Sequence, residues 1–473
     1  MNTLSHPALC SRMPAYLGQV IHRRHVKGDL AFDFSGIILR LEERVELAIL
    51  RAAVAAVLRK YETLRLAFRR CPETGWFPHV HDGMVGEPVD DLCYAVDLSG
   101  LPEEARSERV EMLAQGIASD IDPFSARPLL RVVMFRLGTA DDRLLIAIHH
   151  FVCDGLSTQM VWRDITRFYR ALKDGEQPSF DAERGSITRF VDYLGALTRR
   201  QTVDSLRYWL QRPRRMVEVP GCPGQASFLS TWSQSVTCRG RLRPRQFSGF
   251  REAAARRYRC SVADLLLAAY VYVLGEWLGT GWVAVANWTT AHLAGKGLYP
   301  VEHLVGYFAF PVFTYFHLDC NRSFGDTVEH ARRQQLTAIG NALDFAACRF
   351  MEHPPGAALP PEAVEVSNLP MPLITFCYMG EFSDPAEHVK HQVAEERLKS
   401  YMNEESEKYT LLDCDIDVSG GELFVDVNYP AELPATGQMA AFAARYLQLL
   451  ERVCLEAAGG ERRGENAGGA AAP

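Results

Sequence analysis

The residues best suited to catalysis lie in one short segment, where His149 and His150 are followed by Asp154 and Gly155 in the pattern HHxxxDG. The segment comes directly after an apolar run, residues 144–148. Because successive strand residues point to opposite faces, one histidine can face a cavity while its neighbour packs into the framework. Asp154 can fix a turn by bonding backbone or a cation, and Gly155 allows close approach by a substrate. These residue types indicate a candidate functional site at this turn.

A hairpin and a helix are predicted to position the segment. Residues 129–137 and 143–150 are β-rich runs around a short polar loop, which is typical of an antiparallel hairpin. A helix is expected next, with Ser157 as its N-cap. Its apolar face has helical spacing and consists of Val161, Ile165, Phe168 and Leu172. Upstream, an amphipathic helix is predicted from Leu47, Leu50, Val54 and Val57, followed by a hairpin around residues 72–75.

The polar stretch 173–185 predicts a boundary between two lobes, residues 1–180 and 181–458. The second half repeats the order helix, hairpin and helix without detectable identity to the first. Its expected elements are a buried helix at 263–278, a strand at 282–288, a hairpin at 409–429 turning at Ser419-Gly420-Gly421, and a helix at 439–453. The Gly/Ala-rich tail, residues 459–473, is expected to be disordered.

Composition excludes several classes of protein. The 473 residues are 48% hydrophobic and carry a net charge of −7, so the chain can bury a large core and nucleic acid is not an expected partner. The 12 cysteines form no CxxC pair and indicate small buried side chains in a reducing compartment. The N-terminus lacks the pattern of a signal peptide, and no stretch resembles a membrane span. We expect a monomeric protein of the cytoplasm.

The HHxxxDG segment resembles the signature of the condensation-domain superfamily of nonribosomal peptide synthetases, which is related to chloramphenicol acetyltransferase. Further segments resemble that family in the same order, from about Leu17 to Leu455. They are RKYETLRLAF (59–68), DPFSARPLLRVVMFRL (122–137), DSLRYWLQ (204–211), LVGYFAFPVF (304–313) and KYTLLDCDIDVSGGELFVDVNYPAEL (408–433).

The resemblance implies a mixed α/β (α+β) fold of two acetyltransferase-like lobes, a V-shaped pseudo-dimer with a central tunnel. His150 would be the catalytic residue, since a neutral imidazole can take up a proton near neutral pH. It could instead position the acceptor or stabilise the tetrahedral oxyanion. His149 and Asp154 would be structural supports, and Gly155 would leave room for a pantetheine arm.

The sequence departs from the family where the second lobe usually supplies an Arg to the motif Asp. No Arg occurs between Arg259 and Arg322. By position His292 replaces it, with Lys296 as the other cation, and we expect His292 to lie near Asp154 across the lobe junction. Such a contact would be weaker and more sensitive to pH than one made by Arg, which is always charged. Phe310 also stands where the family usually has Asn.

The function implied is that of a stand-alone condensation enzyme. It would transfer an acyl or aminoacyl group from a carrier-protein phosphopantetheine thioester to an amine or alcohol, with no bound cofactor, in specialised-metabolite (antibiotic) biosynthesis. One alternative is an O- or N-acyltransferase that uses acyl-CoA. Another is a non-catalytic platform that recruits synthetases.

Other candidate sites are weaker. His79 and His81 form an HxH pair without an evident third ligand, so no metal is expected. Cys153 is interpreted as packing within the turn rather than as a nucleophile. The basic patch from His22 to His25 is interpreted as a solvated loop.

Overall fold

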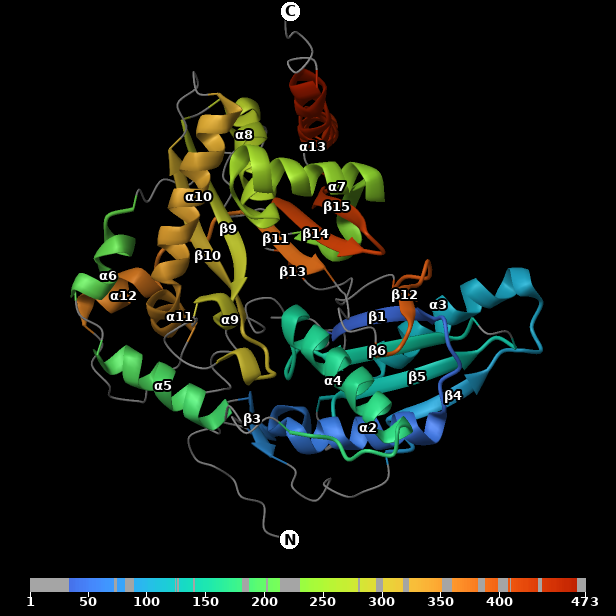
Figure 1. Cartoon of the computed structure of the whole chain (residues 1–473). Helices are drawn as coiled ribbons and strands as arrows, with labels where there is room; N and C mark the ends of the chain where they lie inside the picture. Colours follow the sequence, from blue (N-terminus) through green and yellow to red (C-terminus); the bar gives the residue numbers. More distant parts are fainter. Residues whose placement is uncertain are drawn as a thin grey trace, which may run out of the picture.

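Two β-sheets with helices packed on them form the molecule (Figure 1). The structure is a computed structural model. It describes residues 34–71, 75–80, 89–123, 125, 127–138, 141–180, 187–200, 203–212, 230–279, 281–294, 301–317, 323–350, 360–381, 388–398, 407–408, 410–432 and 436–465.

The first sheet has the strand order β12-β1-β6-β5-β4, and only the β4–β5 pair is parallel. Its strands are β1 (Phe34–Leu41), β4 (Cys93–Asp97), β5 (Leu130–Arg136), β6 (Arg143–His149) and β12 (His391–Val393). Its helices are α2 (Leu47–Lys60), α3 (Glu103–Ser119) and α4 (Gly155–Lys173). The predicted hairpin that leads into the motif is confirmed, because β5 and β6 pair antiparallel. A separate hairpin consists of β2 (Leu66–Cys71) and β3 (Gly75–Val80).

The second sheet has the order β10-β9-β11-β14-β15-β8, with β11 parallel to both of its neighbours. Its strands are β8 (Ser235–Leu242), β9 (Trp282–Thr290), β10 (Ala309–His317), β11 (Ile374–Glu381), β14 (Leu412–Ser419) and β15 (Glu422–Pro430). The helices against it are α7 (Pro244–Glu252), α8 (Val262–Leu278), α10 (Phe324–Gly340) and α13 (Thr436–Glu465), with a π-helical turn (Ala253–Tyr258) between α7 and α8.

Short elements connect these layers. They are α5 (Ile187–Arg200), α6 (Val203–Leu210), α9 (Ala291–Ala294), α11 (Ala342–Phe350), α12 (Pro361–Ser367), the 3₁₀ turns Glu62–Arg65, Trp232–Gln234 and Val301–His303, and the small pair β7 (Ser230–Thr231) with β13 (Glu407–Lys408).

Local sequence accounts for several of these element ends. Helix α8 begins at Ser261, whose side chain and Asp264 form a reciprocal capping box. The β14–β15 hairpin turns through Gly420 and Gly421 as predicted, and their φ angles of 58° and 76° lie in the region that glycine adopts most readily. Helix α13 continues to Glu465, so residues 459–465 are helical where the sequence predicts the start of a disordered tail.

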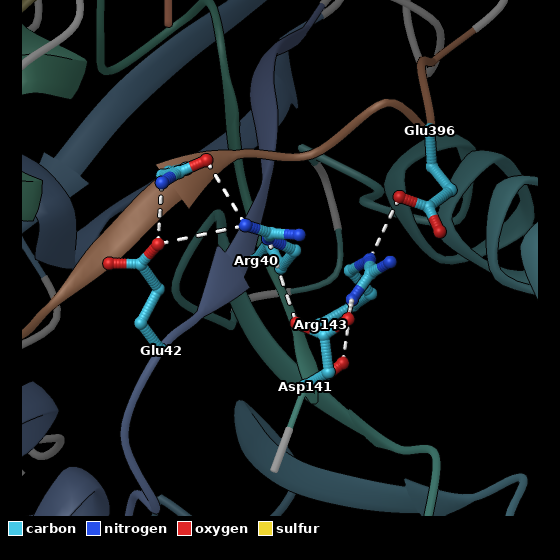
Figure 2. A network of polar contacts seen from close by, with 6 residues as sticks. Arg40, Glu42, Asp141, Arg143 and Glu396 are labelled. Carbon is cyan, nitrogen blue, oxygen red and sulfur yellow. Dashed lines mark hydrogen bonds and ion pairs between the residues drawn. The ribbon is translucent and has the colours of Figure 1, made fainter. Parts of the chain in front are cut away.

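The first sheet is completed by a strand from the other half of the chain, which the sequence did not predict. Strand β12 pairs antiparallel with β1, Leu39 opposite Val393, and lies beside it in Figure 1. Figure 2 shows the ionic side chains around this crossing, including the Arg143–Glu396 pair with an N–O distance of 2.8 Å. The division at 180/181 therefore separates the chain into two halves, but β12 belongs to the first sheet.

One hydrophobic core also extends across that division. It runs from the strands of the first sheet through Trp209 of α6 to Phe313 of β10 and Phe345 of α11. A second core lies between the other sheet and α8 and α13, around Tyr270 and Tyr446. The first core joins the two halves at the turn that carries HHxxxDG, where Phe151 and Val152 are fully buried.

No single helix in the described part of the chain is long and apolar enough to cross a membrane, although the bent pair Pro244–Tyr258 and Val262–Leu278 passes the same test of length and composition.

Candidate active site

The two histidines of the motif differ in environment, as the alternation of strand faces predicts. His149 is the last residue of β6 and is fully buried. Its Nδ1 accepts a hydrogen bond from the backbone N–H of Phe151 at 3.1 Å, and its ring packs edge-on against that of Phe151. His149 therefore holds the turn together from inside the core, which agrees with a supporting role.

His150 begins the turn and is only partly buried. Its Nδ1 lies 2.9 Å from the carbonyl oxygen of Cys153. Because a carbonyl only accepts hydrogen bonds, this contact requires the proton on Nδ1. In the neutral ring the lone pair is then on Nε2, which is the form needed to take a proton from a substrate. The turn thus sets the tautomer of His150.

Asp154 ends the turn and caps the helix that follows. It is 2% exposed, and its Oδ1 accepts from the backbone N–H of Ser157 at 2.8 Å. The prediction of Ser157 as N-cap is wrong: α4 begins at Gly155, with Asp154 as the N-cap. A short carboxylate is a strong acceptor for the unpaired N–H groups of a first turn, which explains why it takes this position.

A loop of the second half docks against this turn. The backbone N–H of Asp154 donates to the carbonyl of Gly306 at 3.0 Å, and the hydroxyl of Ser157 donates to the same carbonyl at 2.8 Å. The N–H of Phe308 donates to Asp154 Oδ2 at 3.1 Å. A Cβ on Gly306 would lie 2.6 Å from the Phe308 ring, so this close approach needs glycine. The predicted segment 304–313 therefore forms the second wall of the site.

Tyr307 of the same loop was not singled out by the sequence. Its ring is edge-on to that of His150, with centroids 5.5 Å apart, and the residue is 6% exposed. The only signal for it was its place inside the segment that resembles the family. A side chain from each half of the chain thus meets at the imidazole.

His292 reaches the junction through an intermediate residue. It lies in α9 and is 8% exposed. The hydroxyl of Thr290 stands between the two predicted partners, 3.2 Å from Asp154 Oδ2 and 3.0 Å from His292 Nδ1. Thr290 was not predicted as a site residue, because one hydroxyl at a strand end carries no distinctive pattern. Lys296, the other cation considered, lies outside the described residues.

The remaining candidates have simpler surroundings. Burial raises the pKa of the Cys153 thiol well above its usual range, and the thiol contacts Thr158 Oγ1 at 3.2 Å, which fits the interpretation as a packed side chain. A Cβ on Gly155 would meet nothing within 4 Å. Phe310 is 1% exposed on β10. Among the residues that the structure describes, no group of three or more His, Cys, Asp or Glu could hold a metal ion. His81 and the patch from His22 to His25 lie outside them.

Comparison with known proteins gives a consistent result. A family model described as "Condensation domain" matches residues 34–463. One of the linear gramicidin synthases of Brevibacillus parabrevis is 24% identical over 445 residues, a match that covers 92% of this chain and 8% of that protein. The chain therefore spans a small part of the length of such relatives.

Solved structures share the fold. The epimerization domain from the third module of tyrocidine synthetase B aligns with a TM-score of 0.75 at 19% identity, covering 91% of this chain and 93% of that one. A structure solved to explain condensation domain-mediated chain release from the enacyloxin polyketide synthase aligns with a TM-score of 0.68 at 17% identity, covering 100% and 86%. The architecture is the mixed α/β pseudo-dimer of two acetyltransferase-like lobes.

Proposed function

Because the chain belongs to the condensation-domain family, we propose that it transfers an acyl or aminoacyl group from a carrier-protein phosphopantetheine thioester to an amine or alcohol, with His150 as the catalytic residue. Condensation domains are acyltransferases that form amide bonds and act on substrates bound to carrier proteins. The thioester is already activated, so no acyl-enzyme is needed.

The hydrogen bond from His150 Nδ1–H to the Cys153 carbonyl is the observation that carries the proposal. It leaves Nε2 to take the proton from the attacking amine or hydroxyl as the C–N or C–O bond forms. When the C–S bond breaks, the same proton passes to the departing thiolate, and His150 returns to its neutral form. Gly155, with open space where a Cβ would be, leaves room for the pantetheine arm beside the turn.

Intact-protein mass spectrometry of loaded carrier proteins tests this function. Carrier proteins bearing fatty acyl or aminoacyl groups are mixed with the enzyme and a panel of small amines and alcohols, and loss of the acyl group with formation of amide or ester is followed. His150→Ala should slow transfer by about 10²–10⁴-fold, the usual contribution of a general base. His317→Ala is the matched control, because His317 is an exposed histidine at the end of β10.

Wild-type rates in His150→Ala would remove the catalytic assignment. The donor is decided by offering the same acyl group on CoA: transfer as fast as from the carrier protein would favour the acyl-CoA-dependent alternative. Carrier binding without turnover by the wild-type protein, for every donor and acceptor, would instead favour the recruitment platform. Circular dichroism of each variant establishes that the fold is intact.

A further inference from the structure

A chain of hydrogen bonds crosses the lobe junction behind the candidate active site. It runs from Asp154 at the start of α4 to the hydroxyl of Thr290 at the end of β9, then to the ring of His292 and on to the carbonyl of Leu304. Asp154, His292 and Leu304 are buried and Thr290 is partly buried. Buried polar groups need their partners, so the positions of the protons in this chain can be worked out.

The two ends of the chain accept hydrogen bonds. Leu304 offers a carbonyl oxygen 2.9 Å from His292 Nε2, so that nitrogen must carry a proton. Asp154 accepts backbone N–H groups on both of its oxygens, from Ser157 and Phe308, and it caps the helix N-terminus. These donors favour the charged carboxylate.

Thr290 has a single hydroxyl proton to give. If it donates to the Asp154 carboxylate, its oxygen can bond His292 only as an acceptor, and Nδ1 must then be a donor. Both ring nitrogens of His292 then carry protons, and the ring is a cation. The competing arrangement has a protonated Asp154 that donates to Thr290, which in turn donates to an unprotonated Nδ1. It has the same net charge but gives up the carboxylate that the two N–H groups favour.

We propose that Thr290 and His292 are positioning residues for the reaction: a doubly protonated His292 is coupled to the Asp154 carboxylate through the Thr290 hydroxyl. The coupling holds the His149–Asp154 turn against the second lobe. It acts on His150 through the backbone, because the Cys153 carbonyl that orients the His150 ring is adjacent to the fixed Asp154. The effect on the rate rests on the proposed function, whereas the proton positions do not.

Nuclear magnetic resonance of the full chain labelled with ¹⁵N-histidine tests the proton positions. The ring nitrogens of His292 are assigned as the signals lost in His292→Gln, and their protonation is read at pH 7 from long-range ¹H–¹⁵N correlations. The proposal requires both nitrogens to be of the protonated type. An unprotonated Nδ1 would overturn it in favour of the neutral arrangement.

A second test compares two adjacent threonines. Thr290→Val removes the coupling hydroxyl at nearly constant volume, and Thr290→Ser keeps it. Thr289→Val is the matched control, because the Thr289 hydroxyl is buried without a hydrogen-bond partner in the described part of the chain. A hydrogen bond to a charged group corresponds to roughly a tenfold or larger effect, so kcat for acyl transfer should fall about 10-fold in Thr290→Val, with KM nearly constant.

Thr290→Ser should keep most of the rate, which a role of the threonine methyl in packing would not permit. Equal kcat in Thr290→Val and Thr289→Val would overturn the positioning role. If Thr290→Val does not fold, the serine variant and the histidine signals still decide the question. If the wild-type protein transfers no acyl group, the proposed function fails, and the His292 signals test the coupling independently.

Discussion

Removing Arg143 should destabilise the protein far more than removing the nearby Arg40, although both bind acidic groups at the same crossing (Figure 2). The Arg143 side chain is 13% exposed and pairs with Glu396, which is 3% exposed, at 2.8 Å. Arg40 pairs with Glu42 at 3.6 Å, and their side chains are 39% and 37% exposed. Burial is the difference that sets the magnitude.

Arg143→Met leaves the Glu396 carboxylate charged and out of water, a cost of about 3–5 kcal/mol in the free energy of unfolding. Glu396→Gln should cost less, about 1–2 kcal/mol, because its amide still accepts from Arg143 and the guanidinium retains the Asp141 carboxylate at 3.6 Å. Arg40→Met should cost about 0–1 kcal/mol, as for other exposed pairs. The double variant Arg143→Met with Glu396→Met should recover much of the loss, because no charge is then left buried.

Urea denaturation of the full chain, followed by circular dichroism, measures these differences through the midpoint at constant slope. A change in slope would mean that β12 detaches before the rest of the molecule unfolds, and hydrogen exchange at Leu39 would then report the local opening. Equal costs for Arg143→Met and Arg40→Met, at equal slope, would refute the reasoning that burial decides the strength of this contact.

Three further predictions concern packing and charge. Cys153→Ala should retain acyl transfer, and iodoacetamide should label Cys153 only after unfolding, because burial raises the pKa of its thiol; activity lost in a folded variant would contradict this. Gly306→Ala should lower kcat by roughly 10-fold or more, since its Cβ would lie 2.6 Å from the Phe308 ring; an unchanged rate would show that the loop adapts freely. Burial, with a smaller contribution from Asp426, raises the pKa of Asp417, so its protonated form favours the folded state and this stability is lost as pH rises. Asp417→Asn should therefore increase the free energy of unfolding by roughly 0.2–1 kcal/mol at pH 7 and less at pH 4, and an equal effect at both values would contradict the assignment.

Local patterns in the sequence were enough to find the elements that carry the site. The apolar run before HHxxxDG predicted a buried strand, and β6 is that strand. Alternation along it predicted that one histidine is buried and the other is accessible, because side-chain direction in a strand follows from its two-residue period. The resemblance of residues 304–313 to a known segment pointed to the second wall of the site.

Contacts between distant segments were decided only by the tertiary structure. Three residues of β12 carry too little pattern to predict, yet they complete the first sheet because β1 presents an unpaired edge to them. Thr290 joins Asp154 to His292 because β9 ends opposite the start of α4, and no spacing along the chain encodes that distance. The sequence determined which side chains can do chemistry here. Packing of the two lobes determined which of them meet, because hydrogen bonds in a buried junction form only between groups that the backbone brings within about 3 Å.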